Sequence, residues 1–136
     1  MSQAEFLQAG KKREDSGMPG TIIAVVDDLF FASKIRGTAE QAGVSVSFPR
    51  HADGVSEIIR RDSPSLIICD LNSTRIDPIA LANRLKGDEA TREVPLLGFF
   101  SHVQTELQRQ AQEAGFDRVM PRSAFTNQLA NILAGR

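Results

Sequence analysis

The sequence predicts an α/β fold in which five parallel strands form one sheet with helices on both faces. Short apolar runs rich in β-branched residues recur along the chain and alternate with stretches of helical periodicity. The runs are almost continuously apolar, which is typical of strands that are covered on both faces, as in a parallel sheet. With 136 residues, the chain has the length of a single domain.

The expected strands cover residues 21–26, 44–48, 65–69, 94–100 and 116–120. The expected helices cover about residues 30–42, 52–61, 78–87, 103–114 and 124–134. The second strand alternates strictly between apolar and polar residues, so it has one solvated side, and we expect it at the edge of the sheet. The whole domain is expected to span residues 20–136, preceded by a flexible, solvated segment at 1–19 that is rich in charged residues.

Residues at the expected helix ends agree with these boundaries. Gly43 and Gly115 suit C-terminal caps with left-handed backbone. Asp77 followed by Pro78 predicts an N-cap with proline at the first helical position, and Ser123 is the expected N-cap of the last helix. Apolar residues at helical spacing are expected to pack on the sheet, namely Ile79, Leu81, Ala82, Leu85, Phe125, Leu129 and Ile132.

Composition excludes several classes of protein. Hydrophobic residues make up 41% and charged residues 24%, and the formal net charge of -1 gives no reason to expect nucleic acid as a partner. No apolar run has the length of a membrane span and no signal sequence precedes the first strand, so we expect a cytoplasmic protein. Cys69 is the only cysteine and is expected to be a buried small apolar residue. His51 and His102 have no other ligand at zinc-binding spacing.

Three carboxylates follow strand-like runs. Asp27 and Asp28 come after the first run, and Asp70 comes after the third. Because the carboxyl ends of parallel strands form the ligand crevice of an open α/β sheet, these side chains are expected to meet there. Such carboxylates repel one another unless a cation lies between them, and Mg²⁺ prefers oxygen ligands. The alternative is that Asp27 and Asp28 cap the first helix, where aspartate is favoured.

Four motifs together resemble the receiver domain of two-component response regulators, which has a flavodoxin-like (βα)5 fold. They are Val25-Val26-Asp27-Asp28, then Leu66-Ile67-Ile68-Cys69-Asp70-Leu71-Asn72, a hydroxyl at Ser101 after the fourth strand, and Ala114-Gly115-Phe116-Asp117 before the last strand. The resemblance covers about residues 20–134.

The resemblance implies a role for each of these polar residues. Asp28 would bind Mg²⁺ most directly, with Asp27 as its partner, and Asn72 would lend a backbone carbonyl to the metal. Asp70 would be a further metal ligand and would accept a phosphoryl group from a phosphohistidine, and Ser101 would hold a phosphoryl oxygen. A carboxylate is an effective nucleophile toward phosphorus only when the incoming negative charge is neutralised, which is what the metal provides.

The chain departs from the receiver pattern at the conserved lysine after the fifth strand. An alignment without gaps through Ala114 and Gly115 puts Arg122 at this place. A second alignment matches Pro121 to the proline of the family and puts Met120 there, which removes the cation. We favour Arg122, because its distance from Ser101 along the chain fits the family better; a guanidinium would still change the geometry, since it is larger and planar.

Three other departures concern access and signal output. His102 stands where receivers usually have a small residue at the entry of the phosphoryl group, and Val119 replaces the aromatic residue that changes rotamer in the fifth strand. The loop after Asp70, residues 73–78, keeps the length of the family's loop but has a different composition.

The resemblance therefore implies a signalling domain rather than an enzyme, one that assists only its own phosphoryl transfer and dephosphorylation. A histidine kinase or phosphotransfer protein would phosphorylate it, and the face formed by the fourth helix, fifth strand and fifth helix would then change its affinity for a downstream protein. The polar fourth helix also allows a weak homodimer. The alternative is a pseudo-receiver that binds its partners without phosphorylation, and a third hypothesis is a flavodoxin-like domain that binds another small ligand in the same crevice.

Overall fold

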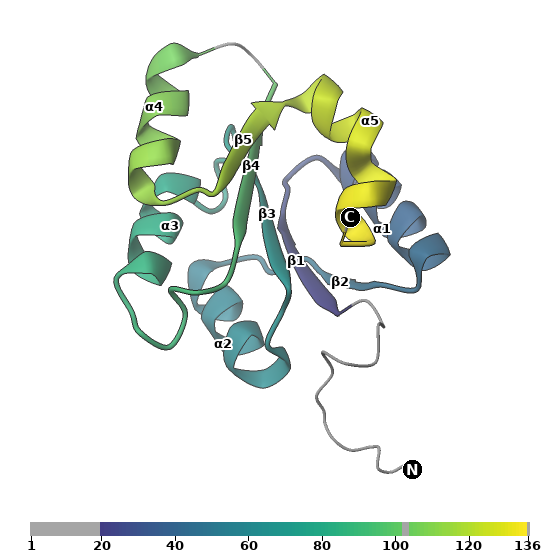
Figure 1. Ribbon diagram of the computed structural model, residues 1–136, viewed down its shortest axis with the longest axis horizontal. Coiled ribbons are helices and arrows are strands. Elements are labelled where there is room, and N and C mark those ends of the chain that lie inside the picture. Colours follow the sequence, from purple (N-terminus) through teal and green to yellow (C-terminus); the bar gives the residue numbers. More distant parts are fainter. Residues whose placement is uncertain (1–19, 102–103, 136) are drawn as a thin grey trace.

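Five parallel strands form one sheet with the order β2-β1-β3-β4-β5 (Figure 1). The computed structural model describes residues 20–101 and 104–135. The strands are β1 (Thr21–Val25), β2 (Ser45–Ser47), β3 (Leu66–Asp70), β4 (Leu96–Phe100) and β5 (Arg118–Pro121). The helices are α1 (Leu29–Ala42), α2 (Ala52–Asp62), α3 (Pro78–Lys86), α4 (Thr105–Ala114) and α5 (Arg122–Leu133). The predicted fold is confirmed, and so is the position of the second strand at an edge of the sheet.

Two predictions lie outside the described residues. One is the flexible segment at residues 1–19, and the other concerns His102 and the start of the fourth helix at residue 103. Within the described part of the chain, no helix is long and apolar enough to cross a membrane.

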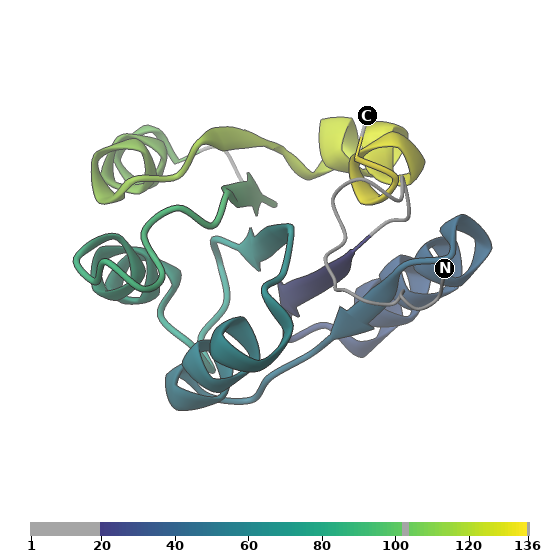
Figure 2. The ribbon, with the colours of Figure 1, turned by 60° about the horizontal axis from the view of Figure 1, so that its bottom comes forward.

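Helices cover both faces of the sheet (Figure 2). On one face, α1 and α5 bury an apolar layer against the sheet that contains Phe31, Phe99 and Phe125. On the other face, α2, α3 and α4 bury a second layer that contains Leu71 and Phe100. Because side chains alternate along a strand, the neighbours Phe99 and Phe100 of β4 serve opposite layers.

The helix caps follow the sequence in three places. Gly43 (φ 73°) and Gly115 (φ 109°) end α1 and α4 in the left-handed region, as predicted. Asp77 caps α3, where its Oδ1 accepts hydrogen bonds from the backbone N–H groups of Ile79 (3.0 Å) and Ala80 (3.2 Å).

The fifth strand and the last helix differ from the prediction. The strand begins at Arg118 rather than at residue 116, because Phe116 is buried against the α3/α4 side and the Asp117 carboxylate accepts a hydrogen bond from the backbone N–H of Leu96 (2.8 Å). The helix begins at Arg122, directly after Pro121, so the prediction that Ser123 caps it is wrong. Proline fixes extended backbone at the end of the strand, and the helix starts at the next residue.

Candidate functional site

The acidic site consists of Asp27, Asp28 and Asp70, which lie at the carboxyl ends of two adjacent strands. Asp70 is the last residue of β3, which lies in the sheet between β1 and β4, and Asp27 and Asp28 follow the end of β1. The side chain of Asp70 is buried, with the residue only 8% exposed, and its Oδ1 accepts a hydrogen bond from the backbone N–H of Asn72 (2.9 Å). The sheet therefore holds this carboxylate nearly out of the solvent.

The pKa of Asp70 is raised above the ordinary value for aspartate. Burial is the main cause, and the negative charges of Asp27 and Asp28 add to it. The hydrogen bond from Asn72 and the positive charge of Arg122 act in the opposite direction without cancelling the rise. Asp70 therefore lies in surroundings that favour either a proton or a nearby cation.

Asp27 is bonded to the loop that follows β3. Its Oδ1 accepts a hydrogen bond from Ser73 Oγ (2.9 Å), and its Oδ2 accepts from the backbone N–H groups of Thr74 (2.8 Å) and Arg75 (3.3 Å). Burial raises the pKa of Asp27, but these hydrogen bonds and the charge of Arg75 together lower it by more, so the pKa lies below its usual value. The ionised carboxylate of Asp27 thus connects the end of β1 to the loop that follows β3.

Asp28 is the N-cap of α1. Its Oδ1 accepts hydrogen bonds from the backbone N–H groups of Phe30 (2.8 Å) and Phe31 (3.2 Å), so the capping interpretation holds for Asp28 but not for Asp27. The Oδ2 atom contacts the guanidinium of Arg122 at 3.4 Å. The pKa of Asp28 is lowered, chiefly by the hydrogen bond from Phe31 and also by Phe30 and Arg122, although burial opposes this.

Arg122 brings a positive charge to the acidic site. Its side chain extends from the first residue of α5 to Asp28, and its guanidinium carbon lies 3.9 Å from the centre of the Phe31 ring. Met120, by contrast, packs against the apolar layer beneath α1 and α5. Of the two residues considered for the place of the receiver lysine, Arg122 is the one whose charge reaches the carboxylates.

Asn72 joins the loops after β3 and β4. Its Oδ1 accepts a hydrogen bond from the backbone N–H of Ser101 (3.0 Å), and its Nδ2 donates to Gln104 Oε1 (2.8 Å). Ser101 thus enters this network through its backbone, and the residue is exposed. Asn72 also donates its own N–H to Asp70, so hydrogen bonds of this one residue connect both loops to the predicted phosphoacceptor.

Three residues of this region were not predicted from the sequence: Phe31, Ser73 and Gln104. Ser73 and Gln104 are bonded to residues 46 and 32 positions away, so no local spacing could reveal these contacts. Phe31 has the helical spacing of a core residue, and nothing in that pattern indicates a cation above its ring.

The residues present fit a hard divalent cation in their chemistry. Among residues 20–101 and 104–135, no group of three or more His, Cys, Asp or Glu side chains is arranged to hold a metal ion. Both carboxylate oxygens of Asp27 accept hydrogen bonds from the loop that follows β3. By contrast, Asp28 Oδ2 has one long contact, and Asp70 is a buried carboxylate with a raised pKa. A cation held by Asp28, Asp70 and the carbonyl of Asn72 would have the oxygen ligands that Mg²⁺ prefers.

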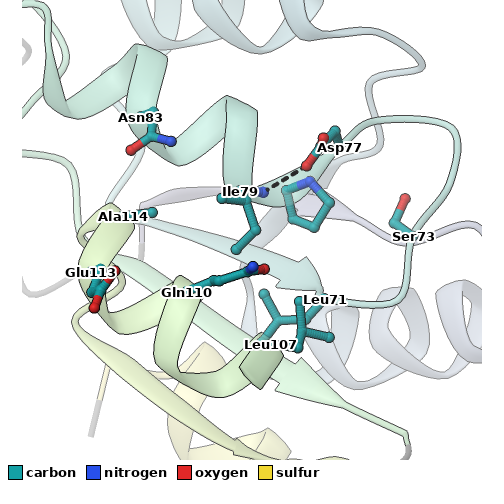
Figure 3. A pocket seen from close by; sticks show the side chains of 10 residues that line it. Leu71, Ser73, Asp77, Ile79, Asn83, Leu107, Gln110, Glu113 and Ala114 are labelled. Atoms are coloured by element: carbon teal, nitrogen blue, oxygen red, sulfur yellow. Dashed lines mark hydrogen bonds between the residues drawn. The ribbon is translucent and has the colours of Figure 1, made fainter. Parts of the chain in front are cut away.

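A groove of about 620 Å³ lies between α3 and α4 (Figure 3). Leu71, Ile79 and Leu107 give it apolar walls, and polar side chains such as Gln110 and Glu113 lie along it. Ser73, which also lines the groove, donates its hydroxyl hydrogen bond to Asp27 and so links the two places. The three acidic residues and Arg122 do not line the groove.

Cys69 is fully buried inside β3, as predicted. Burial raises the pKa of its thiol to about 12, so it stays protonated and unreactive at neutral pH.

Comparison with solved structures identifies the fold. A candidate response regulator of Chloroflexus aurantiacus J-10-fl superposes with a TM-score of 0.71 and 23% identity, over 85% of this chain and 98% of that one. The chain has the receiver fold. The Mn²⁺-bound form of response regulator Rcp1 superposes with a TM-score of 0.68 and 14% identity, over 86% and 91% of the two chains. The phosphorylated cyanobacterial phytochrome response regulator RcpA gives a TM-score of 0.64 and 19% identity, over 86% and 90%.

The likeness between these receivers and this chain lies in the structure. No protein-family model matches the chain, and no curated protein matches it. In this receiver fold, Val119 is half-buried on β5 and packs against the α2/α3/α4 layer, where the family commonly has an aromatic residue.

Proposed function

We propose that this receiver domain accepts a phosphoryl group on Asp70 from a phosphohistidine of a kinase or phosphotransfer protein, and that the modification changes its affinity for a downstream protein. The observation that carries the proposal is the position of Asp70: a buried carboxylate at the end of a central strand, next to Asp28 and the guanidinium of Arg122. A nucleophile in this place is largely shielded from water.

The chemistry is a transfer between two nucleophiles. An Asp70 carboxylate oxygen forms the bond to phosphorus, the bond from phosphorus to the imidazole nitrogen breaks, and its electron pair stays on the imidazole. Mg²⁺ bound at Asp28, Asp70 and the Asn72 carbonyl would neutralise the charge of the phosphoryl oxygens. Arg122 would pair with one of these oxygens, and the Ser101 hydroxyl would donate a hydrogen bond to another.

The protein donor is proposed to dock on the start of α1. Leu29 and Phe30 are the large apolar residues exposed there, at 78% and 90%, and they directly follow Asp28. An exposed apolar pair of this size beside the acidic site suits a transient protein contact that brings a phosphohistidine to Asp70. Phosphorylation would change the partner affinity of the surface formed by α4, β5 and α5, since Arg122 begins α5 and Asn72 contacts the residue before α4.

Incubation with Mg²⁺ and acetyl phosphate tests the proposal. Intact-mass spectrometry should detect one added phosphoryl group, which Asp70→Asn removes and which Asp117→Asn, at the other end of the sheet, does not. Beryllofluoride with Mg²⁺ should shift the amide resonances of Asn72 and Ser101. If neither an adduct nor a shift appears under conditions in which the protein is folded, Asp70 is not a phosphoacceptor.

The second candidate function is a pseudo-receiver that binds its partner without phosphorylation. It is favoured by the hydrogen bonds that already engage Asp27 and one oxygen of Asp28, which leave fewer ligands for a metal. In that case Asp70→Asn would leave partner binding unchanged, whereas a phosphorylation switch requires Asp70→Asn to lock the protein in one affinity state.

A further inference from the structure

We propose that Phe31 is a positioning residue that holds the guanidinium of Arg122 at Asp28, so that Arg122 is a built-in counter-ion which a divalent cation must displace. The displacement of Arg122 by a cation rests on the proposed function, because it concerns Mg²⁺ at the same site. The positioning itself rests on the geometry of Phe31, Arg122 and Asp28 alone.

The guanidinium of Arg122 lies over the ring of Phe31. The guanidinium carbon lies 3.9 Å from the ring centre, well within the distance at which a cation is attracted to the face of an aromatic ring. Arg122 begins α5 and Phe31 lies in the first turn of α1, so the contact joins the N-terminal ends of two helices that follow different strands.

The ring of Phe31 is fixed by its neighbours. Phe31 is 5% exposed and packs against Phe99 (ring centres 5.2 Å apart) and Phe125 (5.9 Å), which are themselves stacked at 4.6 Å. A ring fixed on two sides by other rings cannot turn without repacking the α1/α5 layer. Phe31 therefore offers Arg122 a fixed platform.

Arg122 makes two contacts, an ion pair with Asp28 and a stacking contact with Phe31. The ion pair with Asp28 is long, at 3.4 Å, and both side chains are partly exposed, so it is weak by itself and would not fix a flexible arginine. Stacking on Phe31 removes part of the freedom of the side chain before the ion pair forms. The ring thus determines where the positive charge is.

The two carboxylate oxygens of Asp28 have different partners. Oδ1 accepts the two N–H groups that begin α1, and Oδ2 contacts Arg122. A cation that binds Asp28 without breaking the helix cap must use Oδ2, so it competes with the guanidinium. Loosening Arg122 should then strengthen Mg²⁺ binding.

Calorimetric titration with MgCl₂ at neutral pH tests this inference on four full-length proteins: wild type, Phe31→Leu, Arg122→Gln and the double variant. Phe31→Leu should tighten Mg²⁺ binding about two- to fivefold, the range expected for losing one cation–π contact. Arg122→Gln should tighten it at least as much. Adding Phe31→Leu to Arg122→Gln should change nothing further, because the ring then has no guanidinium to hold.

Phe125→Leu is the matched control. It removes the same number of atoms and one of the two rings that fix Phe31, but it leaves Arg122 over an aromatic face, so it should tighten Mg²⁺ binding less than Phe31→Leu does. Phe31→Tyr is the conservative rescue, since it keeps an aromatic face, and should bind Mg²⁺ as wild type does. Equal effects of Phe31→Leu and Phe125→Leu, or an effect of Phe31→Leu that persists with Arg122→Gln, would overturn the proposal. So would failure of Arg122→Gln to bind Mg²⁺.

A second measurement is independent of metal and of phosphorylation. Protons above an aromatic ring are shielded, so the side-chain Hδ and Hε resonances of Arg122 should lie upfield in wild type and Phe125→Leu, and near ordinary arginine values in Phe31→Leu. Unshifted resonances in wild type would refute the positioning. If the shift and the Mg²⁺ result hold while acetyl phosphate gives no adduct, the phosphoacceptor function fails and this inference stands.

Discussion

At the scale of single residues, the pKa values of Asp70 and Asp28 are displaced in opposite directions. Asp70 has a raised pKa, because of burial and of its neighbours Asp27 and Asp28, so folding disfavours its charged form. Without metal, the unfolded chain loses this proton first as the pH rises from the ordinary value of 3.8, and stability falls through the range up to the raised pKa. Above that range the loss is complete.

Asp70→Asn should therefore stabilise the metal-free protein at pH 7 by about 1 kcal/mol, the order expected for relieving one unfavourable buried charge. The gain should shrink toward pH 3, where Asp70 is protonated in both states. Urea unfolding followed by circular dichroism, with EDTA present, measures both values. A variant less stable than wild type at pH 7 would contradict the argument.

Asp28→Asn should change the stability at pH 7 in the opposite direction to Asp70→Asn. The pKa of Asp28 is lowered, chiefly by the N–H of Phe31, so its charge supports folding above the pKa of the unfolded chain. That support is lost as the pH falls through the lowered pKa. In the same experiment, Asp28→Asn should be less stable than wild type at pH 7 and should approach it in acid.

At the scale of elements, Asp27 holds the loop between β3 and α3 to the end of β1. Asp27→Ala removes the acceptor for Ser73, Thr74 and Arg75. We expect a loss of about 1 kcal/mol, and about tenfold faster hydrogen exchange at the amide of Thr74. Asp77→Ala is the control in the same loop: it removes the cap of α3 and should expose the amides of Ile79 and Ala80 instead. Unchanged exchange at Thr74 in Asp27→Ala would refute this role.

Phe30, at the start of α1, is predicted to affect the docking of a protein donor but not the phosphorylation of Asp70 itself. Because Phe30 is 90% exposed, Phe30→Ala should change the stability by less than about 0.5 kcal/mol. It should leave phosphorylation by acetyl phosphate unchanged and slow transfer from a protein donor, on the order of tenfold, as expected for one of the few interface residues whose truncation costs more than about 1 kcal/mol of binding. Rates measured side by side with both donors decide this. Equal slowing with both donors would mean that Phe30 acts on Asp70 itself.

At the scale of the whole molecule, the fold could be predicted because its signals are local. Each strand and helix has its own periodicity, and Gly43, Gly115 and Asp77 mark helix ends within a few residues. Of the site, only the meeting of Asp27, Asp28 and Asp70 could be predicted, because the carboxyl ends of parallel strands lie at the same edge of the sheet. The partners of Asp27 and Asp28 depend on side-chain rotamers and on residues 46 and 94 positions away, in the loop after β3 and at the start of α5, which no pattern in the chain encodes. The start of α5 was missed because Pro121 can end a strand as well as precede a helix.

The shared sheet makes the two apolar layers and the site one cooperative unit, and two glycines test this. A Cβ at Gly98 of β4 would lie 2.9 Å from Leu71 Cδ2, and Leu71 directly follows Asp70. Gly98→Ala should therefore cost about 1 to 3 kcal/mol by overpacking, and should disturb the amide resonance of Asn72. At Gly37 in α1, a Cβ would meet nothing within 4 Å, so Gly37→Ala should stabilise by about 0.5 to 1 kcal/mol through helix propensity.

Replacement of glycine by alanine should thus destabilise the protein at position 98 and stabilise it at position 37. Urea unfolding of both variants measures the sign, and two-dimensional NMR locates the disturbance. A Gly98→Ala protein as stable as wild type, with Asn72 unmoved, would mean that Leu71 can yield without affecting the acidic site. The end of β3 would then be less rigid than the close approach of Leu71 to Gly98 implies, and the pairing of β3 with β4 together with the bond from Asn72 would be enough to hold Asp70 in place.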